Sequence, residues 1–160
     1  MADDTLGTAL AESGATAVAE PKPAPAPAKP DKGGFLWGTG RRKTAIARVR
    51  VKPGKGTFEV NGKAYDQYFS EMRDREAVMA PLKLTKTEGG VDVYVNAHGG
   101  GYMGQAGAVV LGLARALYKH DPSLEPILRE HGLLTRDSRE VERKKAGQPG
   151  ARRRFQFSKR

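Results

Sequence analysis

Hydrophobic and polar residues alternate in two parts of the chain, and this alternation predicts strands. Residues 42–51 place small or β-branched apolar side chains on one side and mostly arginine and threonine on the other, as in a half-buried strand with a cationic open face. A Pro-Gly turn at 53–56 and a short strand over 57–60 follow, so we expect a β-hairpin. Residues 91–98 alternate most regularly and predict a further strand.

Helical spacing appears in three other segments. Residues 72–85 predict a helix with a loose apolar face of Met72, Val78, Met79 and Leu82. Pro81 is expected to kink this helix or end it. Apolar residues in 106–117 recur at i, i+3, i+4, i+7 and i+11, which predicts a strongly amphipathic helix. Residues 124–131 predict a short helix with Gly132 just past its end. This order of elements favours an α+β fold, with helices packed on one face of a small mixed sheet.

The composition divides the chain into three parts. Residues 1–34 are rich in proline and alanine and have five acids against three lysines, so we expect a disordered acidic extension that samples polyproline II. Residues 35–132 hold the predicted elements and form the expected globular domain. Residues 133–160 lose almost all aliphatic residues, and we expect an extended basic C-terminal tail.

The charge and residue counts narrow the classes of function. The 160 residues have a formal net charge of +10, which is typical of a protein that binds a polyanion. The absence of cysteine excludes disulfides and thiolate metal sites, and the three histidines lack metal-ligand spacing. No apolar run is long enough to span a bilayer, and the acidic first residues are unlike a signal or transit peptide. We therefore expect no cofactor, no metal and no export.

A glycine-rich loop is the strongest candidate for an enzyme site. Residues 99–104 fit the G-x-G-x-x-G pattern between a predicted strand and a predicted helix, and Asp121 follows at the distance of a ribose-binding acid. However, Asp121 ends a helix and no second parallel strand follows it, contrary to a dinucleotide fold. Gln105 and Ala106 also replace the lysine and hydroxyl of a P-loop. We reject a nucleotide site and expect no catalysis, with either a phosphate approaching these glycines or a tight turn that binds nothing.

Three groups of cations remain as candidate contacts for a nucleic acid. They lie on the strand over 42–51 and its approach, in the segment after the last predicted helix, and in the last ten residues, where two phenylalanines accompany them. Residues 139–160 alone have nine cations against two acids. A folded basic face joined to a basic tail suits structured RNA, whose crevices a tail can enter. The alternative interpretations of the terminal cations are a solvated run of charges or a localisation signal.

Four motifs, in one order, resemble those of the bacterial form of the family of the ninth small-subunit ribosomal protein. They are GTGRRKTAIARV over 38–49, GGGYMGQAGA over 99–108, LTRDSREVERKK over 134–145 and the terminal QFSKR. The resemblance covers about residues 36–160. It implies a ribosomal S5 domain-2-like fold, no enzyme activity, and a place on the rRNA in the head of the small subunit of a cytoplasmic ribosome.

The same resemblance implies partners and roles for individual residues. The partners are small-subunit rRNA, peptidyl-site tRNA and neighbouring head proteins, with no DNA and no membrane. Contacts with tRNA, at its anticodon stem-loop, are implied for Ser158, Lys159 and Arg160. Contacts with rRNA are implied for Arg41, Arg42, Lys43, Arg48, Arg50, Gly99, Gly100, Gly101, Gln105, Arg136, Arg139, Arg143, Lys144, Lys145, Arg152, Arg153 and Arg154.

The chain departs from the usual family pattern in three places. The acidic N-terminal extension is one, and no role follows for it from the sequence. Gln148-Pro149-Gly150 stands where more basic residues are common, and Phe155 stands where proline is common. Phe155 and Phe157 can contact RNA or a neighbouring protein. The alternative function is a free-standing RNA-binding or RNA-chaperone protein that uses the same surfaces.

Overall fold

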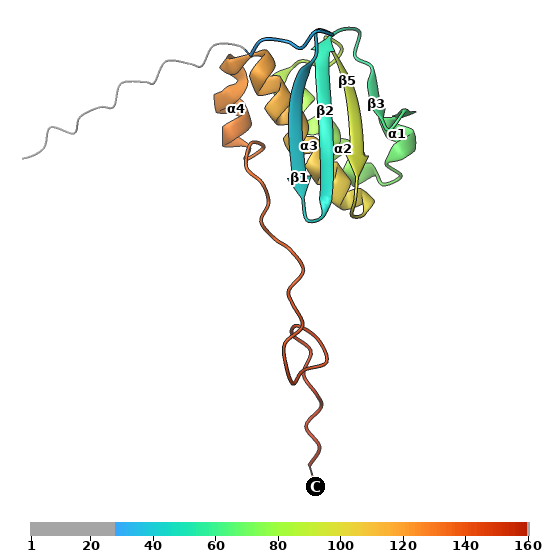
Figure 1. Ribbon diagram of the computed structural model, residues 1–160, viewed down its shortest axis with the longest axis vertical. Helices are drawn as coiled ribbons and strands as arrows, with labels where there is room; N and C mark the ends of the chain where they lie inside the picture. The colour runs from blue at the N-terminus through green and yellow to red at the C-terminus, as the bar shows by residue number, and fades with distance from the viewer. Residues whose placement is uncertain (1–27, 160) are drawn as a thin grey trace, which may run out of the picture.

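A computed structural model describes residues 28–159 and shows a five-stranded mixed sheet with helices on one face (Figure 1). The predicted extension over 1–34 lies largely outside the described residues, as does Arg160. The elements in chain order are β1 (Leu36–Arg42), β2 (Ala45–Pro53), β3 (Phe58–Val60), β4 (Lys63–Ala64), α1 (Tyr65–Tyr68), α2 (Met72–Thr85), β5 (Val91–His98), α3 (Tyr102–His120), the 3₁₀ helix η1 (Pro122–Leu124) and α4 (Glu125–Glu130).

The sheet has the strand order β1-β2-β5-β3-β4. β2 is antiparallel to β1 on one side and to β5 on the other, while β3 runs parallel to β5. The side chains of β2 alternate between the buried and the open face, as predicted, and Val49 and Val51 are fully buried. The predicted combination of a mixed sheet with packed helices is therefore confirmed.

The predicted strand over 42–51 is wrong in its start. β1 precedes it, and a tight turn at Lys43 and Thr44 joins β1 to β2. The left-handed φ of Lys43, 51°, fits this turn. The sequence of β1 hides its strand character because Gly38 and Gly40 occupy two inward positions, where a strand usually places β-branched residues.

The predicted hairpin between β2 and β3 is also wrong. β5 lies between these strands, and β3 pairs with β5 instead. Asp92 explains how the β2–β3 connection crosses the start of β5. Its Oδ1 atom accepts hydrogen bonds from the backbone N–H groups of Lys55, Gly56 and Thr57, at 2.9, 3.1 and 3.0 Å. The carboxylate thus holds the β2–β3 loop over the start of β5.

The helices follow the predicted segments closely, with two local differences. α2 continues past Pro81 to Thr85, so Pro81 does not end it. Met72, expected on the apolar face of α2, is 71 % exposed. α4 ends as predicted, because Gly132 adopts a φ of 67° and Leu133 donates its N–H to the carbonyl of Leu128.

The hydrophobic core lies between the sheet and the helices α2 and α3. Val49, Val93 and Leu113 are fully buried there. The face of α3 that the sequence predicts as apolar is largely buried, and alanines and glycine on its flanks are buried too. Because α3 contacts β1 on one side and α2 on another, it needs more than one apolar stripe. Within residues 28–159, no helix covers the opposite face of the sheet (Figure 1).

Candidate nucleic-acid interface

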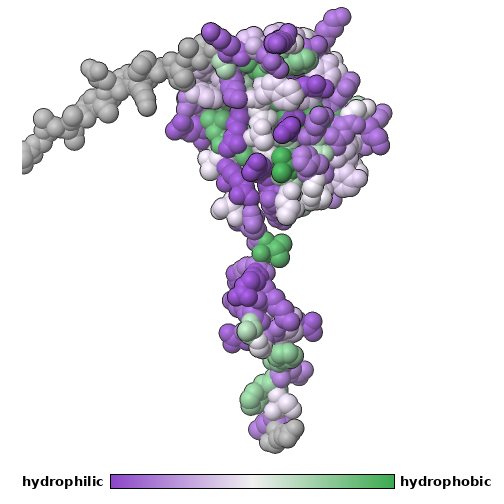
Figure 2. Space-filling model, viewed as in Figure 1, coloured by the Kyte–Doolittle hydropathy of each residue, from purple (hydrophilic) through white to green (hydrophobic). Residues whose placement is uncertain are grey.

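The open face of the sheet brings the cations of β2 together with aromatic side chains of its neighbours. Arg50 lies opposite Trp37 of β1 and opposite Tyr94 of β5. Two residues before Arg50 on β2, Arg48 lies between Thr39 of β1 and Asn96 of β5. Cross-strand partners on one face lie about 5 Å apart at Cβ, so these side chains form one continuous surface. Hydrophilic residues dominate the face that Figure 2 shows, with small hydrophobic patches among them.

Arg50 is held in place by two aromatic rings. Its guanidinium lies 5.5 Å from the ring centres of both Phe35 and Tyr94. The ammonium of Lys52 lies 5.4 and 5.6 Å from the same two rings. Cation–π attraction helps to hold both side chains in place. Lys52 also lies 3.9 Å from Asp92 Oδ2, whereas Arg50 has no acidic partner within residues 28–159. Sequence reasoning found Arg50 but missed the aromatic residues, which are brought to it from other elements.

The glycine loop forms a tight turn against the turn between β1 and β2. Gly99 and Gly100 have positive φ values of 74° and 62°. A Cβ atom on Gly99 would lie 2.6 Å from the carbonyl oxygen of Thr44, so the two turns lie in direct contact. Gln105, a predicted RNA contact, is engaged within the protein. Its Nε2 donates to the carbonyl of Gly99 at 3.1 Å, and its Oε1 accepts from the hydroxyl of Tyr68 at 2.6 Å.

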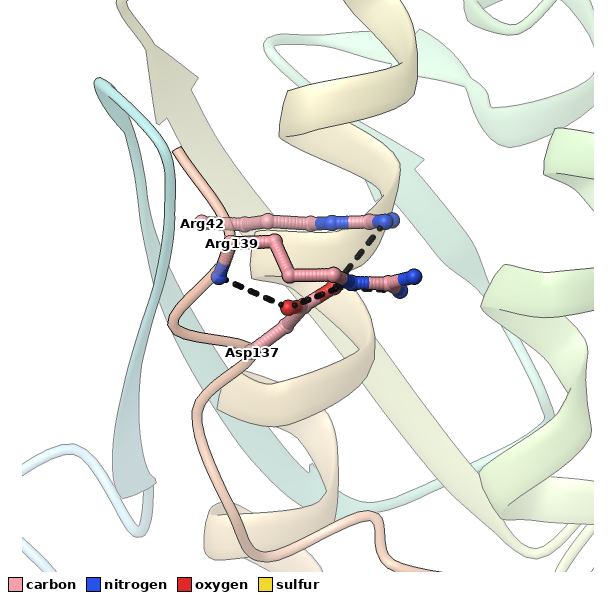
Figure 3. Close-up of polar contacts among 3 residues, drawn as sticks. All are labelled: Arg42, Asp137 and Arg139. Carbon is pink, nitrogen blue, oxygen red and sulfur yellow. Dashed lines mark hydrogen bonds and ion pairs between the residues drawn. The ribbon is translucent and has the colours of Figure 1, made fainter. Parts of the chain in front are cut away.

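Asp137 joins the first predicted cationic group to the second (Figure 3). Its carboxylate lies 3.3 Å from Arg42 Nη2 at the end of β1 and 2.9 Å from Arg139 Nη2. It also accepts the backbone N–H of Arg139 at 3.0 Å. These hydrogen bonds from Arg139, aided by the charge of Arg42, lower the pKa of Asp137 well below its ordinary value. The same interaction raises the pKa of Arg139.

Two further acids pair with predicted contact residues. Arg136 lies 2.7 Å from Glu140, and Arg152 forms a two-pronged pair with Glu142 that raises the pKa of the arginine. Within residues 28–159, ion pairs thus occupy four predicted contacts: Arg42, Arg136, Arg139 and Arg152. In the same part of the chain the other predicted cations have no acidic partner, namely Arg41, Lys43, Arg48, Arg50, Arg143, Lys144, Lys145, Arg153, Arg154 and Lys159.

The C-terminal arm, residues 136–159, holds no helix or strand and extends away from the globular body (Figure 1). Its residues are mostly hydrophilic (Figure 2), and Phe155 and Phe157 are 72 % and 88 % exposed. An aromatic side chain so exposed has no packing role within the described chain. Both aromatic side chains therefore lie on the surface of the arm.

The candidate ribose-binding acid, Asp121, is engaged in a local hydrogen bond. Asp121 accepts the backbone N–H of Ser123 at 2.9 Å and caps η1, so this carboxylate has a local structural role. Residues 28–159 contain no cluster of three or more histidine or acidic side chains that could hold a metal ion. In the same residues, no helix is both long and apolar enough to cross a bilayer.

Comparison with known proteins gives the class first. The model of the family described as "Ribosomal protein S9/S16" matches residues 40–160. The chain is 56 % identical over 126 residues to small ribosomal subunit protein uS9 of Maridesulfovibrio salexigens, covering 79 % of this chain and 97 % of that protein. The protein of the same name from Anaeromyxobacter sp. strain K is 53 % identical over 121 residues, 76 % of this chain and 93 % of that one. The protein of the same name from Borreliella burgdorferi is 52 % identical over 123 residues, which cover 77 % of this chain and 90 % of that protein.

The fold, the basic surfaces and these matches define a bacterial-type ribosomal protein. The chain belongs to the ribosomal protein S9/S16 family. The resemblance seen in the four sequence motifs is therefore confirmed. The family is structural and non-enzymatic, so the prediction that the chain is not an enzyme is confirmed as well.

Proposed function

We propose that the chain is a structural constituent of the small ribosomal subunit in the cytoplasm, where its globular part binds rRNA and its arm contacts peptidyl-site tRNA. Its relatives bear the name of a small-subunit protein. The observation that carries the proposal is the arm itself, which presents exposed cations and aromatic residues beyond the folded body. A segment that buries nothing of its own gains order by binding a partner.

The proposal extends to the fold and to the division of the chain. We assign the globular part, residues 35–132, to the ribosomal S5 domain-2-like folds. Residues 1–34 are a separate extension, and residues 133–160 are the RNA-contacting tail. Neighbouring proteins of the subunit head are further partners of this globular part.

The rRNA contacts fall into two groups. The cations without an acidic partner, such as Arg48 and Lys145, are free to meet phosphates directly. The arginines paired with Asp137, Glu140 and Glu142 exchange a carboxylate for a phosphate, or keep it and use their remaining N–H groups. Gln105 supports the glycine loop by holding the Gly99 carbonyl, and the loop approaches the RNA backbone.

The tRNA contact is proposed for the last three residues. Ser158 and Lys159 are exposed at the far end of the arm, and Arg160 continues the sequence beyond the described residues. A serine hydroxyl, an ammonium and a guanidinium all donate to phosphate oxygens. Distance from the body suits this role, because the arm reaches a ligand that the globular part does not touch.

Removal of Ser158–Arg160 tests the tRNA contact. Small subunits assembled with the truncated chain are expected to form normally but to release peptidyl-site tRNA faster, as a filter-binding time course would measure. A matched control of equal length replaces Lys159 and Arg160 with glutamine, and it should show most of the same loss if charge carries the contact. Unchanged tRNA release from truncated subunits would refute the tRNA part of the proposal.

Sedimentation tests the ribosomal part. A tagged full-length chain is expected to migrate with the small subunit and with whole ribosomes through a sucrose gradient at moderately high salt. A chain that stays at the top of the gradient, or that salt strips from the subunit, would instead support the free-standing RNA-binding protein. The two experiments are independent, because the arm can fail to contact tRNA in a protein that still assembles.

A further inference from the structure

The open face of the sheet carries aromatic side chains as well as cations. We propose that it binds an unpaired stretch of RNA, with a base stacked on Trp37 and phosphates held by Arg48, Arg50 and Lys52. This inference rests on the proposed function and names the form of RNA that this face takes. The face is distinct from the arm and from the glycine loop.

Trp37 is placed for contact with a partner. It is 39 % exposed, although tryptophan usually buries most of its large apolar surface. It occupies an outward position of β1, opposite Arg50. Tyr94 lies on the same face beyond β2, and the backbones of the two residues, two strands apart, are about 10 Å from each other. An exposed indole beside fixed cations matches the arrangement by which proteins hold single strands.

The cations of this face are arranged in advance. Phe35 and Tyr94 fix Arg50 and Lys52 from their sides, so little side-chain entropy is lost when a phosphate binds. Arg48 has no acidic partner within residues 28–159. Two acidic residues lie on neighbouring strands, Asp92 on β5 and Glu59 on β3. They differ in how far they offset the positive charge of this face.

Asp92 is buried, and its Oδ1 atom accepts the three N–H groups of the β2–β3 loop. Its Oδ2 atom lies 3.9 Å from Lys52 Nζ, so Asp92 partly offsets the charge of Lys52 but not that of the two arginines. Glu59 lies beside Tyr94 at the far side of the face from Trp37. The area between Trp37 and Arg48 is therefore cationic without a nearby competing acid, and this charge favours phosphate.

The edge of the sheet argues against a protein strand as the partner. The backbone carbonyls of Trp37 and Thr39 on β1 accept hydrogen bonds from Lys119 Nζ at 2.7 Å and Arg115 Nη1 at 2.8 Å. A strand added to β1 would need those carbonyls. A double-stranded RNA also fits poorly, because its bases are stacked on each other and offer no free ring to Trp37.

Trp37 provides its own reporter, since it is the only tryptophan in the chain. Full-length protein is titrated with a fluorescein-labelled 12-nucleotide oligouridylate and, separately, with a labelled duplex of equal length. Fluorescein anisotropy measures binding at any surface, the arm included, and tryptophan emission measures contact at Trp37. The expected result is saturable quenching by the single strand, and duplex binding with little quenching.

Variants locate the contact. Arg48→Gln is expected to move the midpoint of quenching to higher RNA concentration and to lower the slope of log affinity against log salt by about 0.7, the value for one phosphate on a single strand. Lys83→Gln makes the same charge change on the helical side of the protein and should leave the midpoint unchanged. Trp37→Leu should lower the affinity for the single strand about fivefold or more, as measured by competition with unlabelled RNA. Trp37→Phe should keep most of the affinity, because the phenyl ring can still stack on a base.

Three outcomes would overturn the inference. Equal quenching by single strand and duplex would mean that no base stacks on Trp37. RNA binding without any quenching would leave the arm as the RNA site. Quenching by purified small-subunit proteins in place of RNA would assign the face to a protein partner. If any of these occurs while the chain still sediments with the small subunit, the inference fails and the proposed function stands.

Discussion

Gly40 of β1 lies directly against the backbone of Ala108 in α3. A Cβ atom on Gly40 would be 1.9 Å from the Ala108 carbonyl oxygen, and one on Gly38 would be 2.0 Å from that of Gly112. At these two positions no side chain separates the strand from the helix. The close approach sets the position of β1, and with β1 the positions of Trp37, Arg41 and Arg42.

Replacement of Gly40 by alanine tests this contact. The new methyl group meets backbone that cannot move aside, so we expect Gly40→Ala to lower the free energy of unfolding by about 3 kcal/mol or more, at the upper end of overpacking effects. Urea denaturation measures the change. Gly90→Ala is the control, because a Cβ atom there meets only the Thr87 carbonyl oxygen at 3.8 Å. Equal stability of the two variants would contradict the prediction.

The loop hydrogen bonds of Asp92 predict an acid-sensitive stability. The N–H of Thr57 first, and then that of Lys55, lower the pKa of Asp92 below its ordinary value of 3.8. Above that value the carboxylate is charged in both the folded and the unfolded chain, and its stabilisation is complete. As the pH falls below 3.8, the unfolded state takes up the proton first, so stability is lost down through the folded-state pKa.

Asp92→Asn should therefore lower the thermal midpoint at pH 7 and flatten its fall with pH below 3.8. Differential scanning calorimetry between pH 7 and acid measures both effects. Asp66→Asn is the matched control, since this exposed carboxylate accepts one local N–H, from Gln67, at 2.9 Å. Parallel pH profiles for the Asp92 variant and the wild type would rule out a loop role for the carboxylate.

Asp137 is expected to hold the start of the arm against the body. Its carboxylate joins Arg42 of β1 to Arg139 of the arm, although the three side chains are partly exposed. Asp137→Asn removes the charge that holds both arginines. We expect faster tryptic cleavage after Arg136 and Arg139, with little change in the thermal midpoint, because exposed ion pairs contribute little to global stability.

Glu142→Gln is the control for this cleavage. It removes the same charge from the arm but leaves the contact with β1 intact, because Glu142 pairs with Arg152. Cleavage after Arg136 and Arg139 should then stay at the wild-type rate. If the two variants are cleaved equally fast, charge alone governs access, and Asp137 does not anchor the arm.

Much of the fold follows from local pattern. The strand over 91–98 is read from alternation and the helix over 106–117 from its period, because each buries one regular set of side chains. The arm follows from composition, since a run of cations with few aliphatic residues cannot form a core. Arg48 and Arg50 are placed on an open face by the same alternation.

Tertiary structure alone decided the rest. β1 is a strand because glycines admit α3, and local propensity does not register a contact between segments some seventy residues apart, such as Gly40 with Ala108. β3 pairs with β5 because Asp92 holds the connecting loop. Likewise, the rings of Phe35 and Tyr94 are distant in sequence from Arg50, which they hold. The carboxylate of Asp137 is also distant in sequence from Arg42. Periodicity reports which face of an element is buried, whereas strand order and side-chain partners depend on contacts that form only when distant segments meet.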